Sequence, residues 1–294
     1  MLDNKFPGKD ISIDDIKNKF PLAAKKNKNH KTKFIISDIE FGGKNIPIFA
    51  GPNMIESKNL IFDVAYNVKK IGAAFLRGGA FKPLTFPYRS NKYYETREQG
   101  IEWLKQVKAE IKIPIITEIM DQKHVNLISE VTDIIQIGSR NMQNYPLLIE
   151  CAQTGKPIML KRHYGSSLRD WLGAAEYILK EGNKKVLLCE RGVSVPHTHR
   201  STSRFLLDLQ VIPAAKEITH LPIVSDPSHA TFWRAWVEPM TLASIAAGSD
   251  GIMLEVHPKP EQSAVDPLQS ISYSSFKNLI TKMKKVANAV DRRI

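Results

Sequence analysis

Long apolar runs and cysteines are both scarce in this chain. No uninterrupted apolar run reaches the roughly 18 residues that a membrane-spanning helix needs, and the first residues lack the apolar stretch of a secretory signal. Only two cysteines are present, Cys151 and Cys189, so a disulfide framework is not expected. We therefore expect a cytoplasmic protein with two buried thiols and no membrane contact.

Acidic residues are also few: 30 Asp and Glu stand against 42 Lys and Arg, which gives a formal net charge of +12. Part of the excess lies between Lys25 and Lys33, where we expect a solvated basic arm rather than a nucleic-acid contact. We interpret residues 1–33 as a basic, partly mobile extension and residues 34–294 as one catalytic domain. A small anionic substrate would explain the remaining excess of cations.

Short apolar runs alternate with segments of helical periodicity along the second domain. The eight runs span residues 46–50, 73–77, 114–119, 134–138, 157–162, 185–190, 221–226 and 251–256. Helical periodicity is seen, for example, in residues 57–71, 95–111, 168–181 and 239–247. No Gly-x-Gly-x-x-Gly motif follows the first run, so the alternation predicts a closed (β/α)8 TIM barrel rather than an open doubly wound sheet.

An apolar alternation over residues 34–46 precedes the first run of the barrel. It contains the pair Gly42-Gly43, and a Gly-Gly pair between apolar alternations is typical of the turn of a β-hairpin. We therefore expect an N-terminal β-hairpin with its turn at this pair, closing the bottom of the barrel.

Cationic side chains follow several of the apolar runs. Their positions are Arg77, Arg140, Lys161, Arg162 and Arg191. Because the carboxyl ends of barrel strands meet at one face, a set of these side chains is expected to converge at the barrel mouth. The set consists of Arg77, Lys82, Arg140, Lys161 and Arg191. Cations gathered in this way repel one another unless an anion lies among them, which indicates a ligand with both phosphate and carboxylate, such as phosphoenolpyruvate.

Histidine and carboxylate residues follow the last two apolar runs. His229 follows the seventh run, and Glu255 and Asp266 come from the end of the eighth run and the segment after it. His, Glu and Asp side chains together can bind a divalent metal or act as general acid and base. A functional cluster is therefore expected here as well.

Seven short segments together resemble the signatures of a known enzyme family. They are Gly51-Pro52 and residues 77–83, 136–144, 160–162, 189–192, 226–230 and 255–258. In order and spacing they resemble the type I 3-deoxy-7-phosphoheptulonate (DAHP) synthases, most closely the bacterial branch related to the 3-deoxy-manno-octulosonate 8-phosphate synthases. The resemblance runs from about Phe34 to the C-terminus.

The resemblance implies a transferase that condenses phosphoenolpyruvate with a sugar aldehyde and releases phosphate, most simply the DAHP synthase of the shikimate pathway in aromatic amino acid biosynthesis. It also implies a homo-oligomer, a tetramer or a dimer. The implied phosphoenolpyruvate ligands are Arg77, Lys82 and Lys161 for the carboxylate and Ser139, Arg140 and Arg191 for the phosphate. The implied catalytic residues are Asn53, Lys82, His229 and Asp266, and the implied aldehyde contacts are Pro83, Thr85 and Asp266.

One departure from the family pattern concerns the metal. Metal-dependent members have Cys directly after the first Gly-Pro, where this chain has Asn53, and an amide oxygen is a poor substitute for thiolate with the softer divalent ions. The same exchange is found in the metal-independent octulosonate synthases. We therefore expect no cofactor, and the alternative is a divalent metal held by His229, Glu255 and Asp266.

A second departure concerns the aldehyde. The heptulonate synthases have Arg where this chain has Leu84, and the His197 to Arg204 loop is about three residues longer than their pattern. Arg89 and Lys92 are further candidates for a phosphate contact, although exposed charges are more often solvated. Erythrose 4-phosphate is the expected substrate; an octulosonate-type enzyme, another aldehyde, or a catalytically reduced anion-binding barrel are the alternatives.

Overall fold

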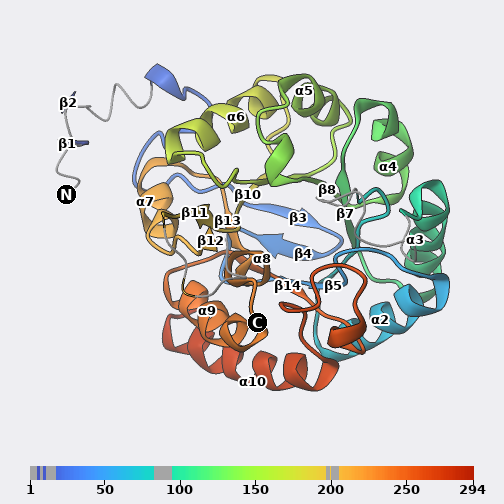
Figure 1. Cartoon of the computed structure of the whole chain (residues 1–294). Coiled ribbons are helices and arrows are strands. Elements are labelled where there is room, and N and C mark those ends of the chain that lie inside the picture. Colours follow the sequence, from blue (N-terminus) through green and yellow to red (C-terminus); the bar gives the residue numbers. More distant parts are fainter. Residues whose placement is uncertain (1–4, 7–8, 11–17, 83–94, 197–198, 200–204) are drawn as a thin grey trace.

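A closed barrel of eight parallel strands forms the centre of the protein (Figure 1). The structure, a computed structural model, describes residues 5–6, 9–10, 18–82, 95–196, 199 and 205–294. The barrel strands are β5 (Ile48–Gly51), β6 (Phe75–Arg77), β7 (Ile115–Ile119), β8 (Ile134–Ile137), β9 (Ile158–Lys161), β10 (Val186–Glu190), β13 (Ile223–Ser225) and β14 (Gly251–Glu255). The expected (β/α)8 barrel is confirmed, with β14 pairing with β5 to close it.

Helices surround the barrel as an outer ring (Figure 1). They are α2 (Lys58–Ile71), α3 (Arg97–Ile111), α4 (Val125–Val131), α5 (Tyr145–Gln153), α6 (Leu168–Lys180), α7 (Val211–Ile218), α9 (Arg234–Ala246) and α10 (Tyr273–Ala289). Serines cap several of them: Ser57 accepts a hydrogen bond from the Leu60 amide at the start of α2, and Ser167 forms a capping box with Asp170 at the start of α6.

The start of α9 differs from the expectation of a helix from residue 239. The helix begins at Arg234, and Pro239 lies inside it. A proline is best tolerated in the first turn of a helix, which favoured the later start. The backbone N–H of Arg234 donates to the Leu268 carbonyl oxygen at 2.7 Å. This tertiary hydrogen bond gives the first helical N–H a partner that local sequence could not indicate.

The N-terminal hairpin is confirmed, but its turn is not where it was expected. Strand β3 (Phe34–Ile36) pairs antiparallel with β4 (Ile39–Phe41), and the two-residue turn is Ser37-Asp38, with φ values of 47° and 67°. Positive φ at both positions is what a type I′ hairpin turn requires, and Asp tolerates it. The expected turn at Gly42-Gly43 is wrong, because these residues follow β4.

Gly42 has a different role from the one expected. It has φ +75°, and a Cβ at this position would lie 2.0 Å from the Thr32 carbonyl oxygen. The glycine therefore lets the end of the hairpin pass close to the preceding segment of the chain.

The hairpin closes the bottom of the barrel with its aromatic face. The Phe41 ring lies 6.0 Å from that of Phe49 and 5.7 Å from that of Phe75, measured between ring centroids. These rings belong to a second core cluster, separate from the layer between strands and helices. Its members are Ile36, Phe41, Phe49, Phe75, Ile116, Ile134, Met159, Leu187, Cys189, Val224 and Met253.

Part of the expected extension packs against the outside of the barrel. Phe20 and Ala24 are buried, and Glu176 of α6 accepts hydrogen bonds from the Leu22 and Ala23 amides at 2.9 and 2.6 Å. Two short strands, β1 (Lys5–Phe6) and β2 (Lys9–Asp10), precede it. The boundary at residue 33 stays a prediction.

Both cysteines are buried free thiols, as expected. Burial, with the charge of Glu150, raises the pKa of the Cys151 thiol to about 12. Within the described part of the chain, no helix combines the length and the apolar character that crossing a membrane would require.

Replacing Phe41 should test how much the hairpin stabilises the barrel. Phe41→Ala removes a fully buried ring and leaves a cavity, so we expect the free energy of unfolding to fall by about 3–5 kcal/mol in a denaturant titration. Ile35→Ala is the matched control, because Ile35 lies on the same hairpin with 66% of its surface exposed. Equal losses in the two variants would contradict the role of the hairpin as a barrel plug.

Candidate active site

Arg77 at the end of β6 lies buried beside Asn53 and Glu255 at the barrel mouth. Its Nη2 donates to Asn53 Oδ1 at 2.8 Å, and its Nη1 lies 3.2 Å from Glu255 Oε1. The amide of Asn53 in turn donates from Nδ2 to Asp266 Oδ2 at 2.8 Å. Residues from β6, from the segment after β5 and from the segment after β14 are thus joined in one chain of contacts.

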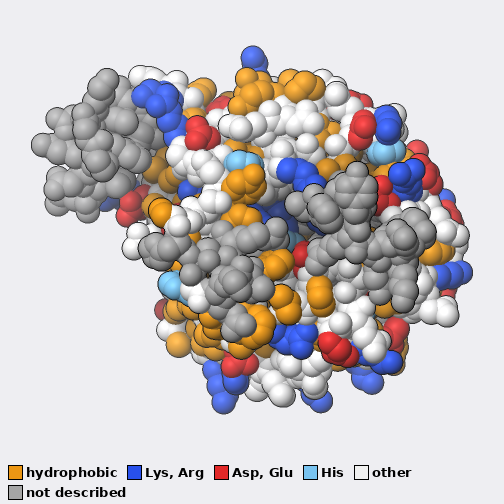
Figure 2. Space-filling model, viewed as in Figure 1, with side chains coloured by type: hydrophobic (Ala, Val, Ile, Leu, Met, Phe, Trp, Pro, Cys, Tyr) orange, Lys and Arg blue, Asp and Glu red, His pale blue; other side chains and the backbone are white. Residues whose placement is uncertain are grey.

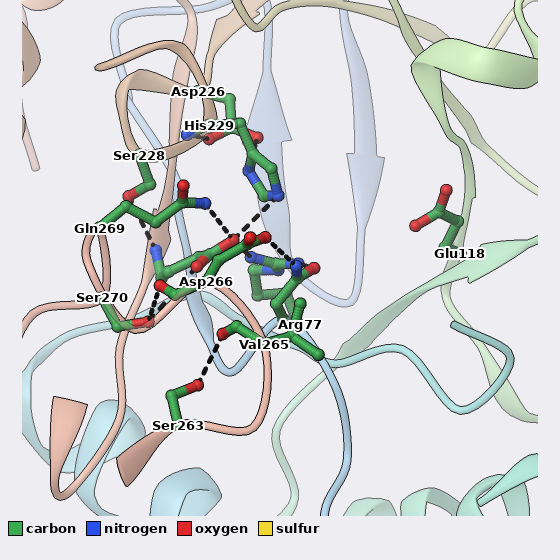
Figure 3. Close-up of polar contacts among 12 residues, drawn as sticks. Arg77, Glu118, Asp226, Ser228, His229, Ser263, Val265, Asp266, Gln269 and Ser270 are labelled. Atoms are coloured by element: carbon green, nitrogen blue, oxygen red, sulfur yellow. Dashed lines mark hydrogen bonds and ion pairs between the residues drawn. The ribbon is translucent and has the colours of Figure 1, made fainter. Parts of the chain in front are cut away.

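His229 extends this chain of contacts to the end of β13 (Figure 3). The residue lies in α8 (Pro227–Thr231), a short helix after β13 that Asp226 caps by accepting from the His229 amide at 3.1 Å. The His229 ring lies between two carboxylates, with Nδ1 2.8 Å from Asp226 Oδ2 and Nε2 2.9 Å from Glu255 Oε1. Lys161 at the end of β9 completes the set, 2.6 Å from the same Asp226 oxygen.

Lys82 and Glu118 form a separate pair, and Figure 3 shows Glu118 apart from the His229 cluster. Lys82 Nζ lies 3.0 Å from Glu118 Oε2. Burial alone would raise the pKa of Glu118, but the charges of Lys82, Lys161 and Arg140 together lower it to about 2. Lys82 and Lys161, predicted to act together, therefore lie around one carboxylate.

The two carboxylates beside His229 are also held ionised by their surroundings. Burial favours the neutral acid, but the charges of His229 and Arg77 outweigh it and lower the pKa of Glu255 to about 2. The pKa of Asp226 lies well below its ordinary value because His229 and Lys161 outweigh the same burial effect. Both groups are therefore anionic near neutral pH.

These carboxylates change the electrostatic argument drawn from the sequence. We expected the cations to repel one another unless a ligand lay among them, yet three of the predicted phosphoenolpyruvate ligands each have a carboxylate partner: Arg77 has Glu255, Lys82 has Glu118 and Lys161 has Asp226. Glu118 was missed as a site residue, although a charged side chain in the buried strand β7 was a readable signal.

Ser139, Arg140 and Arg191 lie at the same end of the barrel, after β8 and β10. Ser139 and Arg140 begin a short 3-10 helix (Ser139–Asn141), where Arg140 is exposed. The Arg191 guanidinium lies 4.3 Å from the centroid of the Phe205 ring. Lys and Arg side chains are visible in the recess at the centre of the face shown in Figure 2.

Arg162 is a cation at a strand end that makes contacts different from those of the others. It lies 3.1 Å from Glu190 and 2.8 Å from Asp208, and its guanidinium lies over the Trp171 ring at 5.9 Å. Burial raises the pKa of Glu190 although Arg162 opposes the effect. Glu190 also accepts from the Gly192 amide at 2.7 Å, so this network fixes the backbone on both sides of Arg191.

Two residues predicted to contact the aldehyde, Pro83 and Thr85, lie outside the described residues. So do Leu84, where the sequence departs from the family pattern, and the further candidates Arg89 and Lys92. Of the His197 to Arg204 loop only His199 is described; its ring lies 6.3 Å from that of Trp236 in an edge-on arrangement. The loop emerges from the antiparallel pair β11 (Val193–Ser194) and β12 (Phe205–Leu206).

His229, Glu255 and Asp266 form a cluster that could hold a divalent cation, because one ligand atom of each lies within 4.8 Å of the others. Asn53 decides how well the cluster suits a metal. An arginine only donates hydrogen bonds, so the amide presents its oxygen to Arg77 and its N–H to Asp266. With an N–H already directed at the Asp266 carboxylate, the residues fit a hydrogen-bonded network better than a metal site.

Comparison with known proteins agrees with this geometry. The model of the DAHP synthetase I family matches residues 20–292. The chain belongs to this family. The family assignment confirms the resemblance drawn from the seven sequence segments, including the octulosonate branch, which appears among the relatives below.

Individual relatives span most of the chain. A phospho-2-dehydro-3-deoxyheptonate aldolase of Thermotoga maritima is 35% identical over 275 residues, which covers 94% of this chain and 80% of that protein. A 2-dehydro-3-deoxyphosphooctonate aldolase of Desulfotalea psychrophila is 29% identical over 271 residues, covering 87% of this chain and 95% of the relative. The solved structure of a truncated 3-deoxy-D-arabino-heptulosonate 7-phosphate synthase from Thermotoga maritima superposes with a TM-score of 0.84 at 34% identity. The superposition covers 94% of this chain and 99% of that one.

The ionised state of Glu118 predicts a specific loss of stability in acid. Its folded-state pKa of about 2 lies below the ordinary value of 4.5, so the stabilisation is complete above 4.5 and is lost as the pH falls towards 2. In denaturant titrations, wild type should be more stable than Glu118→Gln at pH 7, and the difference should narrow below pH 4.5. The control Glu102→Gln, at an exposed position of α3, should show no such narrowing.

Proposed function

We propose that this protein is a DAHP synthase, which condenses phosphoenolpyruvate with erythrose 4-phosphate and releases inorganic phosphate. One observation supports the proposal above all others: Arg77, Lys161 and His229 are joined through two shared carboxylates at the barrel mouth. Active sites of such barrels lie at this end of the strands. The reaction is proposed from the membership of the chain in the DAHP synthetase I family.

Phosphoenolpyruvate would bind across the two halves of the mouth. Arg77, Lys82 and Lys161 would hold its carboxylate, and Ser139, Arg140 and Arg191 would hold its phosphate. Their existing carboxylate partners hold Arg77, Lys82 and Lys161 in place before the ligand arrives, and the exposed Arg140 is open to phosphate. Fixing both reactants in a near-attack geometry lowers the barrier, because the translational and rotational entropy of the two molecules is already lost on binding.

The condensation forms a bond between the methylene carbon of phosphoenolpyruvate and the aldehyde carbon. Water then adds to the neighbouring carbon, and the tetrahedral intermediate collapses to the ketone as its bond to phosphate breaks. His229 would give a proton to the aldehyde oxygen, and its ring is held in place between the carboxylates of Asp226 and Glu255. Asn53 and Asp266 would orient the aldehyde.

The reaction is proposed to need no metal. The hydrogen bonds from Arg77 to Asn53 and from Asn53 to Asp266 support this, because they place a neutral donor where metal-dependent relatives have a thiolate. The alternative is a hard divalent cation held by His229, Glu255 and Asp266, which would polarise the aldehyde oxygen.

The identity of the aldehyde is the part of the proposal with the least structural support. Pro83 and Thr85 are proposed to contact it, and Leu84 cannot donate to a phosphate. An octulosonate-type reaction is the second candidate, favoured by Asn53 and by octulosonate relatives such as that of Desulfotalea psychrophila. A homo-oligomeric state and a cytoplasmic location stay predictions.

An assay of phosphate release tests the proposed reaction and its metal independence. Purified protein is incubated with phosphoenolpyruvate and either erythrose 4-phosphate or arabinose 5-phosphate, each with and without a strong chelator. We expect phosphate release with erythrose 4-phosphate, and we expect the chelator to change the rate of release by no more than about twofold.

The other outcomes revise specific parts of the proposal. Release with arabinose 5-phosphate alone identifies the octulosonate-type reaction, and loss of activity with chelator identifies the metal site. Binding of phosphoenolpyruvate by calorimetry without release under any condition supports a catalytically reduced barrel and overturns the synthase.

Arg77→Lys tests the proposed contact with the carboxylate of phosphoenolpyruvate. A lysine keeps the charge but lacks the planar fork that reaches both Asn53 and Glu255, so we expect kcat/KM for phosphoenolpyruvate to fall by about a hundredfold. Arg293→Lys is the control, because Arg293 bonds to Asn45 beside the start of β5, at the other end of the barrel. Steady-state kinetics that place the two variants within threefold of each other would exclude Arg77 from the binding site.

A further inference from the structure

The segment that follows β14 holds the carboxylates of Asp266 and Glu255 in place. It runs over residues 263–271 and contains Asp266, which accepts from Asn53 (Figure 3). Two other side chains of the segment reach Glu255: Gln269 Nε2 donates to Oε1 at 2.8 Å, and Ser270 Oγ donates to Oε2 at 3.3 Å. The position of this one segment therefore fixes two of the acidic groups at the mouth.

The backbone of this segment has a conformation that local sequence does not favour. Asp266 has φ +55°, in the left-handed region that residues other than glycine seldom adopt. Such a conformation persists when the surrounding structure determines it, and it is often found at functional sites. Ser263 bonds to the Val265 carbonyl oxygen at 2.8 Å before the turn, and the Ile271 amide bonds to Glu255 after it. The middle of the segment needs a further anchor.

Arg234 at the first turn of α9 provides that anchor. Its backbone N–H donates to the Leu268 carbonyl oxygen at 2.7 Å, its Nε to that of Ser270 at 2.6 Å and its Nη2 to that of Pro267 at 2.8 Å. Arg234 thus donates to three carbonyl groups within four consecutive positions of the segment, at residues 267, 268 and 270. Helix α9 follows α8 after two residues, so Arg234 at the start of α9 is close in sequence to His229 in α8.

We propose that Arg234 is a positioning residue that sets the distance between His229 and the pair Asp266 and Glu255. This inference rests on the proposed function of the same site. Arg234 joins the helix pair that presents His229 to the turn that presents Asp266, so its loss should shift Asp266 and Gln269 relative to Asn53 and Glu255. A misplacement of about 1 Å at such a site can slow a reaction about a hundredfold.

The predicted effect separates the two substrates. Of the proposed phosphoenolpyruvate ligands, Lys82 pairs with Glu118 and Lys161 pairs with Asp226, both outside the segment, and Arg77 contacts Asn53 and Glu255, which make hydrogen bonds to the segment. Asp266 lies in the segment itself and is proposed to orient the aldehyde. Removing the Arg234 side chain should therefore change the aldehyde half of the reaction more strongly than it changes the affinity for phosphoenolpyruvate.

Arg234→Met tests this inference with kinetics and calorimetry on the full chain. We expect kcat/KM for the aldehyde to fall between tenfold and a hundredfold while the dissociation constant of phosphoenolpyruvate stays within threefold. Arg234→Lys should recover only part of the activity, since one ammonium group cannot reproduce the two guanidinium contacts in their fixed geometry. If Arg234→Met does not purify as a folded protein, Arg234→Lys alone supplies the comparison.

Arg292→Met is the matched control for a general loss of stability. Arg292 also bonds to carbonyl groups, those of Lys44 and Asn45, but beside the start of β5 at the other end of the barrel. It should lower the melting temperature without changing kcat/KM. Unchanged aldehyde kinetics in both Arg234 variants, or an equal loss in Arg292→Met, would overturn the inference. Absence of activity in wild type with every aldehyde would instead reject the proposed function.

Discussion

The buried carboxylate of Glu255 is the point on which the arrangement of the barrel mouth depends. It lies within 3.3 Å of Arg77, His229, Gln269 and Ser270, which come from three different parts of the chain. A fully buried anion is stable only when cations and hydrogen-bond donors surround it. Removing one partner of such a pair typically costs about 3–5 kcal/mol, because the other charge is left without compensation.

The two ends of the barrel are filled by different kinds of side chain. At the bottom, the hairpin covers the strands with aromatic rings, and Phe41 packs directly on Phe49 and Phe75. At the mouth, the strands end in charged side chains that satisfy one another in pairs. The apolar end gives the fold its stability, so the polar end can hold ionised groups in fixed positions for chemistry.

The fold was predictable from local sequence, and so was the gathering of charged side chains at the barrel mouth. Eight apolar runs separated by helical periodicity specify the barrel, and the cations at the ends of the runs specify where its site lies. The errors have physical causes: the hairpin turn is Ser37-Asp38 because Asp tolerates positive φ, and α9 begins before Pro239 because the distant Leu268 carbonyl caps it. Glu118 was missed because it lies inside an apolar run rather than at its end, although a cation at the barrel mouth needs an anion such as this one beside it.

The sequence alone determined the order of strands and helices, the face on which the functional groups gather and the family to which they belong, because periodicity and motif spacing are local properties. Only the tertiary structure decided which carboxylate pairs with which cation, how Asn53 orients its amide between Arg77 and Asp266, and that Arg234 binds the segment around Asp266. These contacts join residues up to 213 positions apart. Their partners are set by how the closed barrel brings strand ends together in space, which no local pattern records.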